Sequence, residues 1–151
     1  CIQDDKNIIE YIDYKYEKYD NGHIESLGMY IDSVKQGLWI NFHPNGQIKY
    51  INFFKDGKEN GPFEIFYENG LIRHHRFMKN NLSNGNFISY YENGNVINES
   101  YFINDTIDGI SKEYYENGEI YYIWKYDKGK LIEALKGPQF IPPVDEDNIL
   151  E

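Results

Sequence analysis

The chain has very little cysteine and no long hydrophobic run. Cys1 is the only cysteine among 151 residues, so no disulfide can form within the chain and the fold must be stable without one. No apolar segment approaches the roughly 20 residues that a membrane-spanning helix needs. Alanine and leucine, which favour helices, are also scarce. These absences argue against a disulfide scaffold, a spanning helix and a helical repeat.

Positive charge is also in short supply. The sequence has 15 lysines and arginines against 25 aspartates and glutamates, a formal net charge of −10. Such a chain offers few contacts to phosphates and little attraction to acidic headgroups. We therefore expect no nucleic-acid partner and no direct binding to anionic lipid. A protein partner with a basic surface fits this charge better.

Recognisable catalytic chemistry is missing as well. No glycine-rich phosphate loop with lysine and no nucleophile elbow is present. None of the four histidines has the spacing of a metal ligand, and His74 and His75 would point to opposite faces of a strand. Glu68, Glu92 and Glu116 recur because a turn accepts them. We expect no enzymatic activity, no metal and no cofactor.

Aromatic residues supply most of the apolar bulk. The chain contains 15 tyrosines and 9 phenylalanines. Aromatic and β-branched side chains suit a pleated, half-covered surface. The composition therefore predicts strands.

A short motif repeats at a constant interval. Tyr-Glu-Asn-Gly begins at Tyr67, Tyr91 and Tyr115, and looser versions begin at Tyr19 and His43, so that each copy lies 24 residues after the one before. A second glycine column, Gly37, Gly61, Gly85 and Gly109, keeps this interval, as does an aliphatic column, Ile24, Ile48, Ile72, Val96 and Ile120. Self-similarity with such a period indicates a repeat architecture, in which each unit packs against its neighbours.

The motif predicts a tight turn between two strands. Its asparagine and glycine suit the positions of a type I turn followed by a residue with positive φ. The predicted turn residues are Asn21, Gly22, Asn45, Gly46, Asn69, Gly70, Asn93, Gly94, Asn117 and Gly118. A three-residue loop would pair Phe42 with Ile48, Phe66 with Ile72, Tyr90 with Val96 and Tyr114 with Ile120. A two-residue Asn-Gly loop would instead pair position 43 with 48.

A second turn in each unit returns the chain to the next strand. Its markers are residues 55–57, 79–81, 103–105 and 127–129. The predicted fold is all-β, an elongated, single, twisted antiparallel meander of successive hairpins with roughly nine or ten strands. A sheet this wide has to twist, curl into a trough or cover one face.

The sequence also indicates three regions. Residues 1–12 form a lead, residues 13–136 the repeat domain, and residues 137–151 an acidic, proline-containing tail. The terminal repeats resemble caps, because Lys15 and Lys18 replace aromatic residues at one end and Glu133 replaces the recurring glycine at the other.

The repeated pattern resembles a known family. Gly61-Pro62-Phe63, followed by Tyr67-Glu68-Asn69-Gly70 and Ile72, is similar to the MORN repeat, specifically its bacterial variant. The resemblance covers about residues 13–131. It implies successive hairpins in one elongated twisted sheet. Some bacterial variants are similar to proteins labelled as antitoxins. The denser glycine pattern of eukaryotic MORN repeats is absent, so their lipid and dimerisation sites are not carried over.

The candidate binding surface is aromatic. It comprises Trp39, Phe63, Phe87, Tyr90, Tyr114 and Trp124. These side chains either cover the sheet's own apolar face or leave a groove open to peptide or carbohydrate, and both functions are compatible. We expect a non-catalytic module that binds another macromolecule. A cytoplasmic antitoxin-like inhibitor is the alternative, and an envelope protein that binds or processes glycans is a more distant one.

The first residue suggests a location. A cysteine at position 1 followed by Gln3-Asp4-Asp5 resembles a bacterial lipoprotein after signal-peptide cleavage, with the lipid attached to Cys1. The alternative is an arbitrary start of the sequence. We expect a lipid-anchored protein of the bacterial envelope, attached to the membrane only through that lipid. The oligomeric state is left open.

Overall fold

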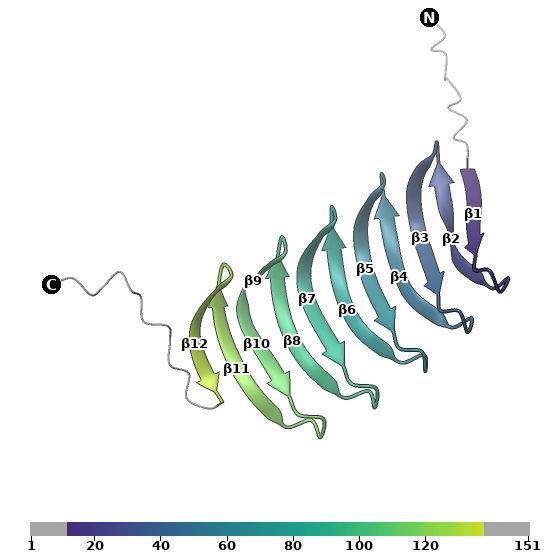
Figure 1. Ribbon diagram of the computed structural model, residues 1–151. Helices are drawn as coiled ribbons and strands as arrows, with labels where there is room; N and C mark the ends of the chain where they lie inside the picture. The colour runs from purple at the N-terminus through teal and green to yellow at the C-terminus, as the bar shows by residue number, and fades with distance from the viewer. Residues whose placement is uncertain (1–11, 138–151) are drawn as a thin grey trace, which may run out of the picture.

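The computed structural model describes residues 12–137, which form strands joined by turns (Figure 1). Cys1, most of the lead and most of the tail lie outside the described residues. The strands are β1 (Ile12–Lys18), β2 (Ile24–Ile31), β3 (Val34–Phe42), β4 (Ile48–Lys55), β5 (Lys58–Phe66), β6 (Ile72–Lys79), β7 (Leu82–Tyr90), β8 (Val96–Ile103), β9 (Thr106–Ile107), β10 (Gly109–Tyr114), β11 (Ile120–Asp127) and β12 (Lys130–Lys136).

All of these strands belong to one antiparallel sheet in which each strand pairs with the next along the chain, the two-residue β9 pairing with β8. The prediction of an all-β meander of successive hairpins is confirmed. The predicted number of strands was too low, because a turn at Asp32-Ser33 adds a hairpin that the sequence analysis did not assign and because β9 and β10 are counted separately. The strands bow in the same sense, so the sheet forms an open trough (Figure 1).

Three-residue loops join the strands along one rim of the trough. In the loop after β3, the amide of Gly46 donates a hydrogen bond to the carbonyl oxygen of His43 at 2.8 Å. The amide of His43 donates to the carbonyl oxygen of Gln47 at 2.7 Å. Gly46 has φ of 87°, which glycine adopts without strain. The predicted pairs of Phe42 with Ile48, Phe66 with Ile72, Tyr90 with Val96 and Tyr114 with Ile120 are all present. The three-residue loop is therefore correct, and the two-residue alternative is wrong.

The asparagine of each of these loops fixes the chain locally. Its side-chain oxygen accepts a hydrogen bond from the amide two residues later, as in Asn45 with Gln47 at 2.9 Å and Asn69 with Leu71 at 3.0 Å. The same bond recurs at Asn21, Asn93 and Asn117. This is an Asx turn, in which the side chain mimics a backbone turn and offers the amide an acceptor.

Two-residue turns form the opposite rim. Both central residues have positive φ, for example 51° and 69° at Asn80 and Asn81, as type I′ turns require. The turns also bond to the preceding hairpin: the amide of Asn81 donates to the carbonyl oxygen of Glu59 at 3.0 Å, while Asn81 Oδ1 accepts from the amide of Glu59 at 2.7 Å. Each turn therefore stabilises its own hairpin and also holds that hairpin against the preceding one.

The second glycine column lies in β-bulges. Between the pairs of Asn52 with Phe63 and Phe54 with Glu59, β4 has one residue where β5 has three. Gly61 lies in this bulge with φ of 140°, a region that is essentially open only to glycine. Gly37, Gly85 and Gly109 occupy equivalent places with positive φ. Bulges bend and twist a strand, so this column accounts for the curvature of the trough.

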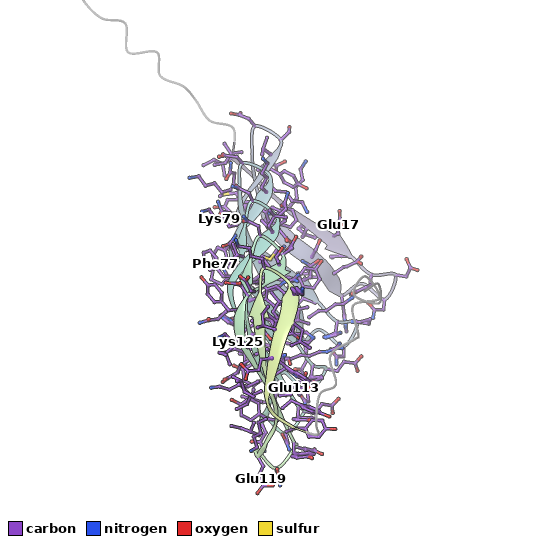
Figure 2. All side chains as sticks on the ribbon, turned by 90° about the vertical axis from the view of Figure 1, so that its left-hand side faces the viewer. Glu17, Phe77, Lys79, Glu113, Glu119 and Lys125 are labelled. Atoms are coloured by element: carbon purple, nitrogen blue, oxygen red, sulfur yellow. The ribbon has the colours of Figure 1, made fainter. Side chains whose placement is uncertain are left out.

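Strand alternation separates two faces. All of the described side chains that are buried lie on one of them, because side chains converge on the inside of a curve: Ser26, Trp39, Asn52, Phe63, Met78, Ser89, Ser100 and Ser111. We call it the concave face and the other the convex face. Figure 2, seen along the sheet, shows Glu17 and Glu113 on the concave side and Phe77, Lys79 and Lys125 on the convex side.

Candidate binding groove on the concave face

A groove runs across the strands on the concave face, and its N-terminal part is hollowed by about 470 Å³. The lining side chains combine aromatic rings with amides and carboxylates: Glu17, Ser26, Tyr30, Lys35, Trp39, Asn41, Tyr50, Asn52, Phe54, Glu59 and Phe63. Within residues 12–137 no second layer covers this face, since every strand belongs to the single sheet. No other element of the described chain therefore covers the concave groove.

The structure brings together only part of the predicted aromatic surface. Trp39, Phe63, Phe87 and Trp124 lie on the concave face, whereas alternation places Tyr90 and Tyr114 on the convex face. The six predicted residues are therefore divided between the two faces of the sheet. In the repeat, the tyrosine column follows the tryptophan and phenylalanine column by three positions, and an odd separation along a strand reverses the face.

Trp39 is a well-packed part of the groove. Its indole lies against the backbone of Gly28, where an added Cβ would come within 2.1 Å of the ring. Tyr30 and Phe54 flank the indole at centroid distances of 5.1 and 6.0 Å, with interplanar angles of 89° and 74°. These edge-to-face contacts are favourable aromatic geometries. Trp39 is consequently only 6% exposed.

Polar groups beside Trp39 are incompletely paired. Asn52, directly opposite Trp39, donates from Nδ2 to Glu59 Oε1 at 2.8 Å. Its Oδ1 and the Nε1 of Trp39 are buried without a hydrogen-bond partner among the described residues. Burial, followed by the negative charge of Glu59, raises the pKa of Tyr50 above its ordinary value. This end of the groove therefore combines aromatic surface with negative charge and unused hydrogen-bonding groups.

Arg76 brings positive charge to the middle of the groove. Arg76 lies over the ring of Phe63 at 4.4 Å, and the ring of His74 lies 5.6 Å from that of Phe87. Burial, with smaller contributions from Arg73 and Arg76, lowers the pKa of His74 below 6.5. Arg76 Nε and His74 Nδ1 have no hydrogen-bond partner among the described residues. His74 is therefore predominantly neutral at pH 7.

The C-terminal end of the groove is closed by side-chain contacts. Trp124 stacks on Tyr122 with ring centroids 4.6 Å apart, and its Nε1 donates to Glu113 Oε1 at 3.2 Å. A hydrogen bond with Tyr121, together with smaller contributions from burial and neighbouring charges, raises the pKa of Tyr122 to about 12. Trp124 therefore belongs to a packed cluster.

The sequence analysis did not identify Tyr30, Lys35, Asn52 and Phe54 as groove residues. Tyr30 and Phe54 belong to a column 24 residues apart that continues at Met78, Phe102 and Tyr126. This periodicity was available as a signal. The placement of Lys35 beside Trp39 depends on the bulge between the pairs of Gly28 with Trp39 and Met29 with Gln36, which the sequence does not disclose.

The convex face carries an exposed apolar row. Leu38 pairs with Phe53, and Pro62 pairs with Phe77. Phe77 and Tyr101 on this face are 45% and 44% exposed. Farther along, Lys112 and the hydroxyl of Tyr114 contact Glu99 at 3.7 and 2.9 Å. The convex face therefore carries both exposed apolar side chains and polar pairs.

The histidines have local contacts. His74 and His75 lie in β6 and contact Phe87 on the concave face and Glu64 on the convex face, as strand alternation predicted. In residues 12–137, no group of three histidine, cysteine or acidic side chains is arranged to hold a metal ion. The same residues contain no helix long and apolar enough to cross a membrane.

Comparison with protein families places three of the hairpins in a known class. Residues 35–56, 83–104 and 107–128 match the family described as MORN repeat variant. Each matched segment begins after one two-residue turn and runs into the next, so it corresponds to one hairpin of the sheet. A search of curated proteins found no match. Repeats of this kind are generally interaction modules and generally non-catalytic. Over these three segments the chain is therefore similar to MORN-variant repeats.

Proposed function

We propose that this protein is a non-catalytic interaction module that binds a protein partner along the concave groove. The observation that carries the proposal is the groove itself, an uncovered surface that concentrates aromatic rings, carboxylates and partnerless polar atoms. Aromatic side chains with a few polar groups are the usual lining of binding sites. The general role of MORN repeats as interaction modules supports the same conclusion.

The partner is expected to bring positive charge to the N-terminal part of the groove. Glu17 and Glu59 both line the hollow beside Trp39. Carboxylates at a partly desolvated surface favour a partner with lysine or arginine and disfavour an acidic one. The net charge of −10 for the whole chain adds to this attraction over longer distances.

A peptide-display selection tests the proposal. Random peptides are selected on the folded chain, and the enriched sequences are synthesised and titrated. We expect enrichment of basic and aromatic peptides whose affinity falls as salt rises. Phe87→Leu, on the concave face, should weaken binding several-fold, as should Glu59→Gln.

Phe77→Leu provides the matched control for Phe87→Leu. It makes the same change on the convex face, where Phe77 lies (Figure 2). Binding should change less than twofold. Peptides that lose affinity with Phe77→Leu and keep it with Phe87→Leu would refute the concave groove as the binding surface.

The cellular setting stays a prediction from the sequence. We propose the bacterial envelope as the location and a cytoplasmic antitoxin-like inhibitor as the alternative. Fractionating the producing cells distinguishes the two, since the first predicts the protein in membranes and the second in the soluble cytoplasmic fraction.

A further inference from the structure

Trp39, Tyr30 and Phe54 form three sides of a box on the concave face. The indole of Trp39 is the floor, with Gly28 behind it. Tyr30 and Phe54 stand at 89° and 74° to this floor on either side. Trp39 and Phe54 present π faces to one small volume, which is an arrangement that attracts a cation. The ring of Tyr30 has a second lysine over it, with Lys15 Nζ 4.9 Å from its centroid.

The box already holds an ammonium group from the same chain. Lys35 Nζ lies 4.0 Å from the centroid of the Trp39 ring and 5.1 Å from that of Phe54. Lys35 reaches this position because it pairs with Tyr30 across the two-residue turn at Asp32-Ser33. The dimensions of the box are therefore those of a lysine ammonium.

Lys35 is held in the box by weak contacts. Among residues 12–137 it forms no salt bridge, so its interactions with the rings are the main attraction on the ammonium. Cation–π contacts at partly exposed sites are individually modest. The side chain is long and flexible, and it lines the hollow of the groove. An ammonium group of another molecule, with similar cation–π contacts to the rings, can therefore compete with Lys35.

The box is specific to this hairpin. The residues that stand at the position of Lys35 in the later hairpins are Glu59, Ser83, Ile107 and Leu131, paired with Phe54, Met78, Phe102 and Tyr126. None of them is a cation. The repeat fold therefore does not require a lysine here, because the same cross-strand pair forms in the later hairpins with an acidic, a polar or an aliphatic residue at this position.

From this geometry we infer that the box of Tyr30, Trp39 and Phe54 is a recognition site for a lysine side chain of the partner protein, and that Lys35 occupies it until the partner displaces it. Glu17 and Glu59, which line the same hollow, attract the incoming positive charge. The inference rests on the proposed function, since it names the group that the groove recognises. Displacement of Lys35 also opposes binding of neutral ligands, which gain no cation–π contact in exchange.

A titration with a minimal probe tests the box directly. Nα-acetyl-lysine amide is added to the folded chain, and the indole N–H signal of Trp39 is followed by NMR, with Trp124→Phe used to assign it. We expect a saturable shift with an affinity in the millimolar range. Nα-acetyl-norleucine amide, which has the alkyl stem without the charge, should produce no saturable shift.

Variants of Lys35 and of the walls sharpen the test. Lys35→Gln removes the internal competitor and should increase the affinity for the lysine probe about two- to fivefold. Lys79→Gln removes the same charge from the convex face (Figure 2) and should leave the affinity within experimental error. Phe54→Leu keeps an apolar side chain but removes one aromatic wall of the box. It should lower the affinity for the lysine probe several-fold. The dispersion of the amide spectrum verifies that each variant is folded.

Equal responses to the lysine and norleucine probes would overturn the inference, as would unchanged affinity in folded Lys35→Gln. This failure is distinguishable from failure of the proposed function. Display-selected peptides that still depend on Phe87 and Glu59 would maintain the groove as a binding surface without a lysine box. Peptides that depend on Phe77 would refute the groove itself.

Discussion

The first residue of four of the five recurring turns contacts the next hairpin. The hydroxyls of Tyr19, Tyr67 and Tyr91 donate to the carbonyl oxygens of Phe42, Tyr90 and Tyr114, at 2.7, 2.6 and 3.0 Å. At the second turn His43 replaces tyrosine, and its Nε2 lies 3.3 Å from the carbonyl oxygen of Phe66. The recurring tyrosine of the motif therefore serves contact between repeats and not the turn alone.

Removing one of these hydroxyls should loosen the contact between two hairpins. Tyr67→Phe deletes the bond to Tyr90 and is expected to lower the free energy of unfolding by about 0.5–1.5 kcal/mol, measured by urea denaturation. Tyr101→Phe is the matched control, because Tyr101 is 44% exposed on the convex face, and it should change the stability little. A larger loss for Tyr101→Phe would contradict the assignment.

His74 should make stability depend on pH. Its pKa is lowered in the folded chain, chiefly by burial, so below about pH 6.5 the unfolded chain binds a proton that the folded chain does not. Stability contributed by neutral His74 is thus present above its unfolded pKa and decreases as pH falls through the window below it. Urea midpoints at pH 7.5 and 5.5 should differ more for the native chain than for His74→Gln. An equal difference would exclude His74 as the cause.

At this scale, sequence reasoning predicted the turns better than the binding surface. The asparagine and glycine of each loop act through local geometry, so their own sequence indicates their conformation. The box around Trp39 instead depends on Gly28, Lys35 and Phe54, which come from three strands and meet through a bulge. Side-chain contacts of this kind follow from register and are not visible in a single segment.

Each hairpin joins two different kinds of bend. The three-residue loops place one glycine at positive φ, whereas the two-residue turns need two residues with positive φ. Asparagine and aspartate tolerate that conformation better than most residues. Asp32-Ser33 forms such a turn and lies 24 residues before Asp56-Gly57. The period was therefore a signal for this turn, but the sequence analysis did not assign it, because its residues do not resemble the other turns strongly.

The bulge glycines should differ in how strongly they resist substitution. Gly61 has φ of 140°, and an added Cβ would lie 3.0 Å from Phe53 Cβ. Gly109 has φ of 76° and no atom within 4 Å of that position. Gly61→Ala should lower the free energy of unfolding by about 3 kcal/mol or more, and Gly109→Ala by about 1–2 kcal/mol. Chemical denaturation measures the free energy of unfolding of both variants. Equal losses would contradict the prediction, because they would mean that the structure shifts to relieve the contact between the new Cβ and Phe53.

The last hairpin shows what happens where this glycine is missing. Glu133 stands at the position of the glycine column, and β12 pairs with β11 through two separate single-residue irregularities. In the other hairpins the extra residues gather in one bulge. The sequence predicted an atypical terminal repeat here, but not that the bulge would divide, because this depends on how β12 follows the curvature of β11.

As a whole molecule, the sheet is a stack of interchangeable hairpins. Deleting residues 71–94 removes one complete period and joins Gly70 to Asn95, which keeps every turn in phase. The shortened chain should fold with a strand-rich circular dichroism spectrum and a lower free energy of unfolding, because one hairpin and its contacts are lost.

Deleting residues 83–94 is the control for the whole-repeat deletion. It removes β7 from Ser83 onward and the loop that follows, so the two-residue turn at Asn80-Asn81 would lead directly into β8. Two-residue turns would then follow one another along the chain, and the alternation with three-residue loops that places bulges and faces in phase would be lost. This chain should lose its cooperative unfolding transition. Cooperative folding of the half-repeat deletion, or failure of the whole-repeat deletion to fold, would contradict an array of independent hairpins.

The direction of the backbone hydrogen bonds has a mechanical consequence. Strands lie across the trough and each pairs with its sequence neighbours (Figure 1), so a force applied between Ile12 and Gly137 acts along the bonds. Only the outermost strand then bears the load, and the sheet opens like a zipper, one hairpin at a time. Each released period of 24 residues extends the chain by about 80 Å, which makes the array an extensible tether that yields under low tension.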